Sequence, residues 1–542
     1  MKRTANLLAA VSCAALAAGP LPAAVNDVFD VYTVDDLTNA CANATANFNT
    51  IRVHPGVYDL TGMPMKPATR AADGSVTASG TTLAISTYGG RLIGLGERPD
   101  DTVIQGGGAA DSCRLLSFAK ICTVSNLTFT GGHVSGASES GGVASDANGT
   151  FTDCVFSNNY ARNFGGVFDG VKTVTRCRFV GNRAGSGGVL RPITDGKKEP
   201  TLLRDCHFED NVAAATQEKA GQNGGVAYYG CTWSNCVFIG NAAKVGGVFG
   251  SVFSHTNVVL DCRFERNTAE NGAVAAFGAL AAATNCTFVG NVSSETGSNL
   301  LGLDPGTKDA YEVGAGGDLF ACTIAANTGM PLVVGATLRS CTLRGNVGNR
   351  TNTNPLFLNC ALYNSLVTES RGGAHDMSQI VGGDRATLAN CTVASNAFCA
   401  VNYAVVGGAN AVNTVFAGNY LVARATGAFV KRQDMNAKNL PSALTNCLWT
   451  AQAGAPDAAV AVGCRLVPDR DLRFADAAAG DWSIGRRSVA RNAGWSDAAY
   501  LEAVGAIDLR GLPRVFSGDG AEIDVGAYEC NVTPMGLLML LR

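Results

Sequence analysis

The chain has 542 residues, a net charge of −3 and 66 glycines, and only 16% of its residues are charged. This composition is typical of a stacked β-solenoid with many tight corners. No basic block argues for nucleic acid as a partner, and no acidic block suggests an ion-binding tail.

Residues 1–23 have the pattern of a signal peptide. Lys2 and Arg3 precede an apolar run that begins at Leu7, and small residues near Ala23 offer a cleavage site. We therefore expect a protein that is secreted or held at the cell surface, in the outer membrane or cell envelope. No later stretch reaches the roughly 18 apolar residues of a membrane helix, so we expect any membrane association to be peripheral, with no transmembrane span.

Residues 24–60 are predicted to form an N-terminal cap and the first coil of the solenoid. Thr33 and Asp36 resemble a helix capping box, and Leu37 and Cys41 fall on one face of the helix that would follow. A short helix here would cover the open end of the core, which would otherwise expose a β edge to other chains.

Residues 61–452 are predicted to form the β-helix repeats. A short phrase, Cys-x-Phe-x-x-Asn, often followed by Gly-Gly-Val, recurs between Cys154 and Asn291 and decays toward residue 452. The cysteines of neighbouring copies are 23 to 30 residues apart. A recurring period indicates a stacked repeat fold, and the alternation of apolar and polar residues indicates strands rather than helices. We predict an all-β fold, a right-handed single-stranded parallel β-helix with a short N-terminal capping helix. The cysteines of the phrase are Cys154, Cys177, Cys206, Cys236, Cys262 and Cys286.

Stacked coils lie about 4.8 Å apart, so like residues should form interior columns. We expect one column of cysteines, one of phenylalanines, and one of asparagines whose amides bond to each other along the axis. The phenylalanines are Phe156, Phe179, Phe208, Phe238, Phe264 and Phe288. The asparagines are Asn159, Asn182, Asn211, Asn241, Asn267 and Asn291.

The column cysteines are interpreted as small buried hydrophobes rather than as a ladder of disulfides. Parallel side chains about 4.8 Å apart are too far from each other for a relaxed bridge. Two pairs outside this spacing are better disulfide candidates, Cys231 with Cys236 and Cys391 with Cys399.

The combination of Phe-x-x-Asn and Gly-Gly-Val resembles the paired motif of the chlamydial polymorphic outer-membrane protein repeat. The resemblance is clear over residues 140–291 and weakens toward residue 452. It implies a surface-exposed or secreted β-helical passenger that acts as an adhesin, with the repeat motif linked to adhesion. The motif phenylalanines and asparagines are therefore candidate binding residues. The chain departs from that family because no run of amphipathic strands precedes Arg542, so we do not expect an autotransporter barrel.

Two further segments resemble known families. Residues 506–514, Ala-Ile-Asp-Leu-Arg-Gly-Leu-Pro-Arg, and residues 523–529, Ile-Asp-Val-Gly-Ala-Tyr-Glu, are similar to the ending of bacterial choice-of-anchor Q proteins, which are exported β-helical proteins usually of unassigned function. Residues 51–58 resemble the first coil of many pectin-lyase-like folds. We expect C-terminal coils and a cap over residues 453–530 and a tail over residues 531–542.

The outward-facing residues beside the cysteine column are the best place to look for chemistry. Six charged residues there fall within a few coils of each other: Arg176, Arg178, Asp205, His207, Asp261 and Arg263. An alternating charge lattice on a solvated sheet is the simpler interpretation, because the carboxylates do not recur as the cluster that a hydrolase needs and no lyase-like element repeats. We retain Arg178, His207 and Arg263 as candidate binding residues and name no catalytic residue.

Metal and cofactor sites are not predicted. The five histidines have no metal-ligand spacing. Asp304, Asp309, Glu312 and Asp318 fall in a glycine-rich stretch, and we interpret it as a plain acidic loop because its spacing fits no calcium motif.

These observations predict a monomeric, exported protein with adhesin-like binding to a host or environmental surface or glycan along the solenoid flank. Two alternatives stay open. A polysaccharide lyase or glycoside hydrolase of pectin-lyase-like fold would need a catalytic cleft built from loops between coils. A structural surface-layer protein would need no ligand at all.

Overall fold

The computed structural model describes residues 27–530 with gaps. The residues left out within that range are 87, 137–138, 146–148, 193–200, 215–221, 251–255, 276–278, 295–316, 330, 349–353, 376–377, 400–402, 437–442, 455–456, 458–459 and 516–521. The predicted signal peptide, the tail over 531–542, and Asp304, Asp309 and Glu312 of the acidic loop lie outside the described residues.

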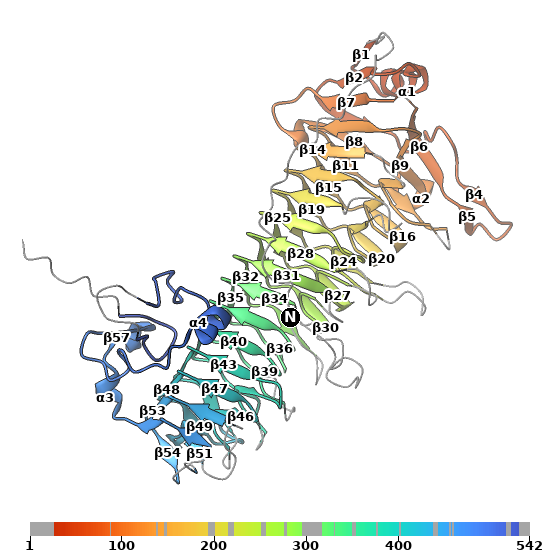
Figure 1. The fold of residues 1–542 in the computed structure, drawn as a ribbon. Coiled ribbons are helices and arrows are strands. Elements are labelled where there is room, and N and C mark those ends of the chain that lie inside the picture. The colour runs from red at the N-terminus through yellow and green to blue at the C-terminus, as the bar shows by residue number, and fades with distance from the viewer. Residues whose placement is uncertain are drawn as a thin grey trace, which may run out of the picture.

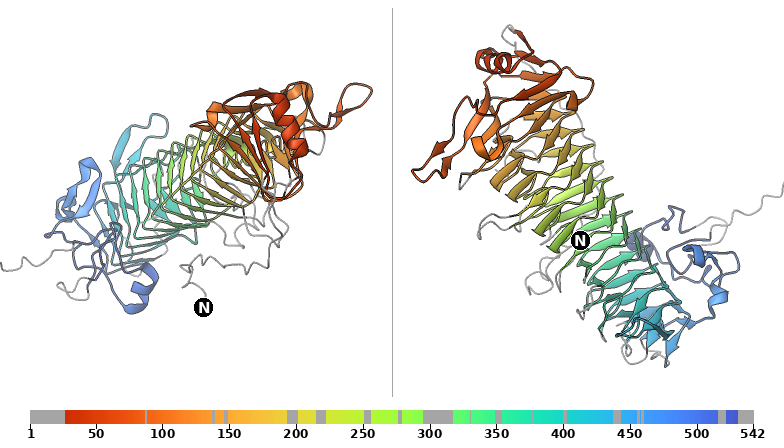
Figure 2. Two further views of the ribbon diagram at one scale, coloured as in Figure 1. Left: turned by 90° about the horizontal axis from the view of Figure 1, so that it is seen from above. Right: turned by 180° about the vertical axis from the view of Figure 1, so that it is seen from behind.

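The described chain winds into a long parallel β-helix (Figures 1 and 2). A 17-stranded sheet, here called sheet A, and a 16-stranded sheet, here called sheet B, extend along it. Shorter sheets close each coil, the largest of which has seven strands and runs from β12 (His133–Val134) to β33 (Val292–Ser293). The prediction of an all-β, right-handed parallel β-helix is confirmed.

The strands of sheet A are β1 (Val28–Val31), β2 (Thr50–Val53), β7 (Gly90–Gly94), β10 (Cys122–Ser125), β14 (Gly149–Thr152), β18 (Thr173–Thr175), β22 (Leu202–Arg204), β25 (Thr232–Ser234), β28 (Asn257–Leu260), β31 (Leu280–Thr284), β34 (Asp318–Phe320), β37 (Thr337–Arg339), β40 (Ala361–Tyr363), β43 (Thr387–Ala389), β47 (Asn410–Val412), β52 (Ala443–Thr445) and β55 (Ala461–Val462). The strands of sheet B are β3 (Gly56–Asp59), β8 (Thr102–Gln105), β11 (Thr128–Thr130), β15 (Val155–Ser157), β19 (Arg178–Val180), β23 (His207–Glu209), β26 (Val237–Ile239), β29 (Arg263–Glu265), β32 (Thr287–Val289), β35 (Thr323–Ala325), β38 (Thr342–Arg344), β41 (Leu366–Thr368), β44 (Thr392–Ala394), β48 (Val415–Ala417), β53 (Leu448–Trp449) and β56 (Arg465–Leu466).

A single left-handed residue turns the chain from sheet A into sheet B in each coil from β14 to β53. We call this position the A–B corner. Its φ angles lie between 46° and 55°, a region that asparagine and aspartate tolerate better than most residues. The corner residues are Asp153, Arg176, Asp205, Asn235, Asp261, Asn285, Ala321, Ser340, Asn364, Asn390, Asn413 and Asn446.

The Gly-Gly-Val phrase forms the corner that closes the coil. Gly187 has a φ of 62°, and Val189 is fully buried. A Cβ on Gly188 would lie 2.2 Å from the carbonyl oxygen of Gly225 in the next coil. The first glycine therefore supplies a left-handed turn and the second allows close stacking of two backbones.

The phenylalanine column is confirmed. Neighbouring rings from Phe156 to Phe288 stack with centroids 4.7 to 5.0 Å apart, and the angles between their planes do not exceed 13°. The spacing follows from the strand separation of about 4.8 Å, since each ring lies over the ring of the coil before.

The asparagine ladder is also confirmed, and it extends further than the strict motif. From Asn159 to Asn346 the side-chain oxygen of each asparagine accepts hydrogen bonds from the backbone and the amide of the preceding one; Asn241, for example, donates to Asn267 Oδ1 from its backbone at 2.9 Å and from Nδ2 at 3.0 Å. Ser370 then takes the place of one asparagine, accepting from the Asn346 N–H at 3.3 Å and donating from its own N–H to Asn396 Oδ1 at 2.9 Å. The same Nδ2 also donates to the carbonyl oxygen of Phe208 at 3.0 Å. The ladder ends at the fully buried Asp434, which accepts both bonds from Asn419.

The cysteine column is buried and unbridged, but its thiols do more than fill space. The backbone N–H of Cys154 donates to the sulfur of Cys177 at 3.4 Å. The thiol of Cys177 in turn donates to the carbonyl oxygen of Thr175 at 3.3 Å. Ser365 occupies the cysteine position in the coil after Cys341. Its hydroxyl accepts a hydrogen bond from the Cys341 N–H at 3.1 Å, as a cysteine sulfur does elsewhere in the column. A serine can replace a cysteine here because the column satisfies corner backbone with a small donor and acceptor.

The two predicted disulfides are wrong. Cys231, Cys236 and Cys391 are free thiols. Cys231 and Cys236 lie at opposite ends of β25, and a strand that rises about 3.3 Å per residue holds them too far apart. Cys391 belongs to the column, whereas Cys399 packs in a separate small cluster with Val422.

The N-terminal cap is the predicted helix, α1 (Val34–Asn43). Thr33 accepts a hydrogen bond from the Asp36 N–H at 3.1 Å, and the Asp36 carboxylate accepts from the Thr33 N–H at 3.0 Å, which completes the capping box. Leu37 and Cys41 are buried against the core. The helix covers the end of the solenoid, at the top of Figure 1.

The coils end at β56, and the chain then turns back along the solenoid. We call residues 467–530 the C-terminal module. Its elements are α3 (Asp469–Leu472), β57 (Phe474–Asp476), a 3-10 turn (Ala477–Ala479), β58 (Asp481–Ile484) and α4 (Ala498–Val504). Figure 1 shows α4 beside the coils that contain β40 and β43. No helix in the described part of the chain is long and apolar enough to cross a membrane.

Candidate binding surface

The motif phenylalanines and asparagines lie in the core. Every phenylalanine from Phe156 to Phe288 is 0% exposed, and none of the asparagines from Asn159 to Asn291 is more than 1% exposed. Their partners are the neighbouring coils, so a ligand on the outside of the folded chain cannot contact them. The predicted binding residues that remain accessible are Arg178, His207 and Arg263.

These three residues lie in one row on the outer face of sheet B. Each is the first residue of its strand, and the register pairs Arg178 with His207, His207 with Val237, and Val237 with Arg263. The row is therefore continuous along the axis over three coil steps, or about 14 Å at the usual strand spacing.

A second row, two residues further along each strand, provides the carboxylates. Arg178 Nη2 lies 2.8 Å from Glu209 Oε2, and His207 Nε2 lies 3.4 Å from the same oxygen. Arg263 Nη2 lies 2.5 Å from Glu265 Oε2. We call Arg178, His207, Glu209, Arg263 and Glu265 the charged flank.

The arginines of the charged flank are open to solvent. The Arg178 side chain is 53% exposed and that of Arg263 is 57% exposed. Exposed ion pairs of this kind contribute only about 0.2–1 kcal/mol. A ligand can therefore exchange a protein ion pair for a contact with its own hydroxyl or anionic group at small cost.

The electrostatics of Glu209 do not favour acid catalysis. The hydrogen bond from Arg178 holds the pKa of the Glu209 carboxyl below its usual range, with His207 adding to the effect. A general acid at neutral pH needs the opposite shift. Glu209 is thus built to stay a carboxylate, which suits recognition of hydroxyls or cations.

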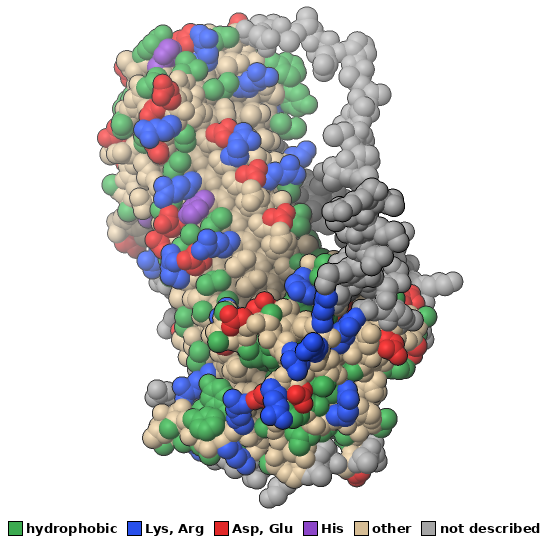
Figure 3. Space-filling model, turned by 90° about the vertical axis from the view of Figure 1, so that its left-hand side faces the viewer, with side chains coloured by type: hydrophobic (Ala, Val, Ile, Leu, Met, Phe, Trp, Pro, Cys, Tyr) green, Lys and Arg blue, Asp and Glu red, His purple; other side chains and the backbone are tan. Residues whose placement is uncertain are grey.

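The other three charged residues predicted nearby belong to a different row, the A–B corner. Arg176 forms two hydrogen bonds with Asp153, at 2.7 and 2.8 Å. Asp205 accepts from Asn235 at 2.8 Å, and Asp261 accepts from Asn285 at 2.7 Å. The six residues thus fall into two parallel rows. The corner row is paired within itself, whereas Arg178, His207 and Arg263 pair with the glutamates of the charged flank. Figure 3 shows a face on which acidic and basic side chains interleave in this way over the upper half.

The sequence did not reveal a buried polar network in the C-terminal module. Arg514 is 1% exposed and donates to Glu529 Oε1 at 2.5 Å, to Asn364 Oδ1 at 2.9 Å and to the carbonyl oxygen of Gly526 at 3.2 Å. Asp508 accepts from the Glu529 N–H at 2.9 Å. Arg514, Asp508 and Glu529 belong to segments 506–514 and 523–529, and here they fasten the module to a corner asparagine.

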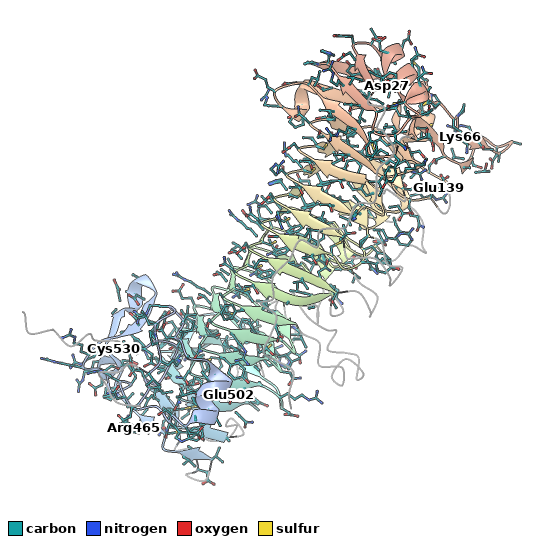
Figure 4. The ribbon with its side chains drawn as sticks, turned by 45° about the horizontal axis from the view of Figure 1, so that its top comes forward. Asp27, Lys66, Glu139, Arg465, Glu502 and Cys530 are labelled. Atoms are coloured by element: carbon teal, nitrogen blue, oxygen red, sulfur yellow. The ribbon has the colours of Figure 1, made fainter. Side chains whose placement is uncertain are left out.

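Burial dominates the titration of this network. It raises the pKa of Glu529 to about 8, although the Arg514 guanidinium acts in the opposite direction. Burial also raises the pKa of Asp524. Figure 4 labels Glu502 in α4 and Cys530 at the end of the described chain, in the part of the molecule that the network holds together.

Known proteins resemble this chain only weakly. No protein-family model and no curated protein matches the chain. Among solved structures it is similar to a variant of the PL6-family alginate lyase AlyGC, with a TM-score of 0.30 and 12% identity over 81% of this chain and 53% of the lyase. A mannuronic-acid-specific family 6 lyase from human gut microbiota gives a TM-score of 0.32 and 11% identity over 82% of this chain and 91% of that one. Pectate lyase Pel9A gives 0.19 and 12% over 94% and 98%. The chain spans about half the length of the first of these proteins, and similarities this low carry no information on activity.

Proposed function

We propose that this chain is an exported, adhesin-like binding protein that holds a glycan or another polar ligand along the charged flank. It acts as a monomer at the cell surface or after release from the cell. The proposal rests on a difference in exposure along the solenoid. The C-terminal module covers part of the later coils, whereas the arginines of the charged flank, on earlier coils, are exposed to solvent.

The rigidity of the solenoid supports binding of an extended ligand. The stacked rings and the asparagine ladder fix the spacing of Arg178, His207 and Arg263. Side chains held in fixed positions lose little entropy when they bind. A linear chain that lies along the axis can therefore meet both arginines at once.

Catalysis is not part of this proposal. The two glutamates of the charged flank each pair with an arginine, and Glu209 has a lowered pKa, so neither the geometry nor the charge state fits a general acid next to a nucleophile or base.

The experiment that tests the proposal compares binding by two variants. The mature chain, the Arg178→Ala/Arg263→Ala variant and the Arg183→Ala variant are titrated with a panel of neutral and acidic polysaccharides. Arg183 is a matched control because it is exposed but lies on β20 (Arg183–Ser186) in the seven-stranded sheet. We expect at least one polysaccharide to bind, with at least about tenfold weaker affinity in the double variant, which corresponds to about 1.4 kcal/mol.

Equal affinities of the double variant and the control would overturn the proposal, provided that both melt at the temperature of the unmodified chain. Absence of binding to every polysaccharide and to whole cells would also overturn it and would favour the structural surface-layer alternative.

A further inference from the structure

A hollow lies where the C-terminal module meets the end of sheet B, several coils beyond the charged flank. It is a cavity of about 420 Å³. One wall is the turn after β48, and the others come from β50 (Phe429–Arg432), α3 and the β57–β58 hairpin. The side chains of interest are Arg432, Asp469, Arg470, Arg473, Phe474 and Trp482.

The lining carries more positive than negative charge. Three arginines face the cavity against one aspartate, Asp469, which pairs with Arg432. Arg470 reaches Asp471 only at 3.8 Å, and its side chain is 87% exposed. Arg473 has no ion-pair partner within the described residues. Two guanidinium groups, those of Arg470 and Arg473, are therefore available to an anion, and guanidinium binds carboxylate or sulfate through paired hydrogen bonds.

One side of the cavity is aromatic. Phe474 and Trp482 pack edge to face with centroids 5.0 Å apart and an angle of 78° between the rings. Phe474 is only partly buried, so part of its ring is accessible beside the arginines. Trp482 is 5% exposed as a residue, and its indole N–H has no acceptor in the described chain. This wall therefore offers an apolar ring surface beside the guanidinium groups.

We propose that this cavity binds an anionic sugar, with its carboxylate or sulfate group on Arg470 and Arg473 and its ring against Phe474. A cavity of this volume is within the range of small-molecule sites, which combine apolar walls with a few polar groups. The site is independent of the charged flank, since it lies several coils further along sheet B and uses residues of the C-terminal module.

The test uses the mature full-length chain and three probes, D-glucuronate, glucose 6-sulfate and neutral D-glucose. Binding is measured by titration calorimetry and by the change in tryptophan fluorescence. We expect one or both anionic sugars to bind at least about tenfold more tightly than glucose. Preference for glucuronate or for the sulfate identifies which anion the site takes.

Two substitutions locate the site. Arg470→Ala removes an exposed guanidinium, and Arg473→Asn removes the other with a residue that tolerates the φ of 48° at this position. We expect the combined variant to lose at least about tenfold in affinity for the anionic sugar. The control is Arg486→Ala, which removes an exposed arginine that does not line the cavity.

The inference is overturned if neither anionic sugar binds more tightly than glucose, or if the combined variant binds as tightly as the control. The Arg178→Ala/Arg263→Ala variant should keep its affinity for the anionic sugar. A loss in that variant would place the binding on the charged flank and would also overturn the inference.

Discussion

The A–B corner has the same backbone in the first and second halves of the solenoid but two different surroundings. In the first half, Asp205, Asp261 and their partner asparagines pair with each other and face solvent. In the second half, Asn364, Asn390 and Asn413 turn the chain with the same left-handed conformation, but the C-terminal module covers them.

The contacts under the module show how a corner becomes a docking site. Asn364 donates to the carbonyl oxygens of Val504 at 2.9 Å and Ile507 at 3.1 Å. Asn413 both donates to and accepts from the backbone of Trp495, each at 2.8 Å. A corner asparagine needs its backbone conformation for the coil, so its side chain is left to bind either a neighbouring coil or another segment. This difference decides which coils stay open to a ligand.

Detaching the C-terminal module from the later coils should remove the difference between exposed and covered corners most completely. Replacing Arg514 by methionine leaves the Glu529 carboxyl and the Asn364 oxygen buried without the hydrogen-bond donor that they share, and we expect a loss of about 3 kcal/mol in the free energy of unfolding. Amides of α4 should then exchange with solvent about a hundredfold faster. The Arg486→Ala variant is the control, and unchanged exchange in α4 of the methionine variant would contradict the docking role of Arg514.

Substitutions in the asparagine ladder should lower the stability by the same amount in both halves of the solenoid. Replacing Asn241 by alanine removes two donated bonds and the acceptor for the Asn211 N–H, and replacing Asn396 by alanine removes the corresponding bonds to Val367 and Asn419. We expect each change to lower the free energy of unfolding by about 2 kcal/mol. Denaturant unfolding measures this, and an unchanged midpoint for either variant would show that the ladder contributes nothing there.

The corner itself provides a matched pair of substitutions. Asn390 and Asn285 both have a φ of 52°, so the strain of placing alanine there is the same. Asn390 donates to the carbonyl oxygen of Asp524 and accepts from the Tyr500 hydroxyl, whereas the Asn285 side chain donates to the exposed Asp261. We expect Asn390→Ala to cost about 1–2 kcal/mol more than Asn285→Ala in denaturant unfolding. Equal costs would mean that docking adds nothing at the corner.

The stability of the C-terminal module, which covers part of the second half of the solenoid, should also depend on pH. Burial raises the pKa of Glu529 from an ordinary value of 4.5 to about 8, so the folded chain keeps a proton that the unfolded chain has released between these values. Stability is then fully present below about pH 4.5 and is lost as the pH rises toward 8. We expect the module to lose at least about 1 kcal/mol of stability from pH 5 to pH 8.

Denaturant unfolding at the two pH values measures this loss, and Glu529→Gln, which cannot ionise, should remove the dependence. If the unmodified chain and the glutamine variant show the same pH dependence, Glu529 is not its source.

The repeat made the coils predictable from the sequence. Cys154, Phe156 and Asn159 recur at fixed spacing, and each column needs only its own residue type one coil away. The hydrogen-bonding role of the cysteine column was not predicted, although Ser365 and Thr414 at the same position carry the signal that a small donor is required.

The docking of the C-terminal module was hidden because its contacts join distant residues. Arg514 reaches Asn364 across 150 residues, and nothing local distinguishes Asn364 from the exposed Asn285. The arginines of the cavity, Arg432 and Arg473, are likewise brought together only when the module turns back onto the last coils. For the charged flank, the sequence identified the row of Arg178, His207 and Arg263 but not which carboxylates pair with it.

The most direct test of the proposed function is to examine a bound polysaccharide after long incubation with the mature chain. The polysaccharide that binds best is incubated with and without Ca²⁺, recovered, and analysed for chain length, new reducing ends and unsaturated products that absorb in the ultraviolet. The account predicts that the polysaccharide binds and is recovered at its original length. Shortened chains or unsaturated ends would contradict it and would identify the protein as a polysaccharide-cleaving enzyme.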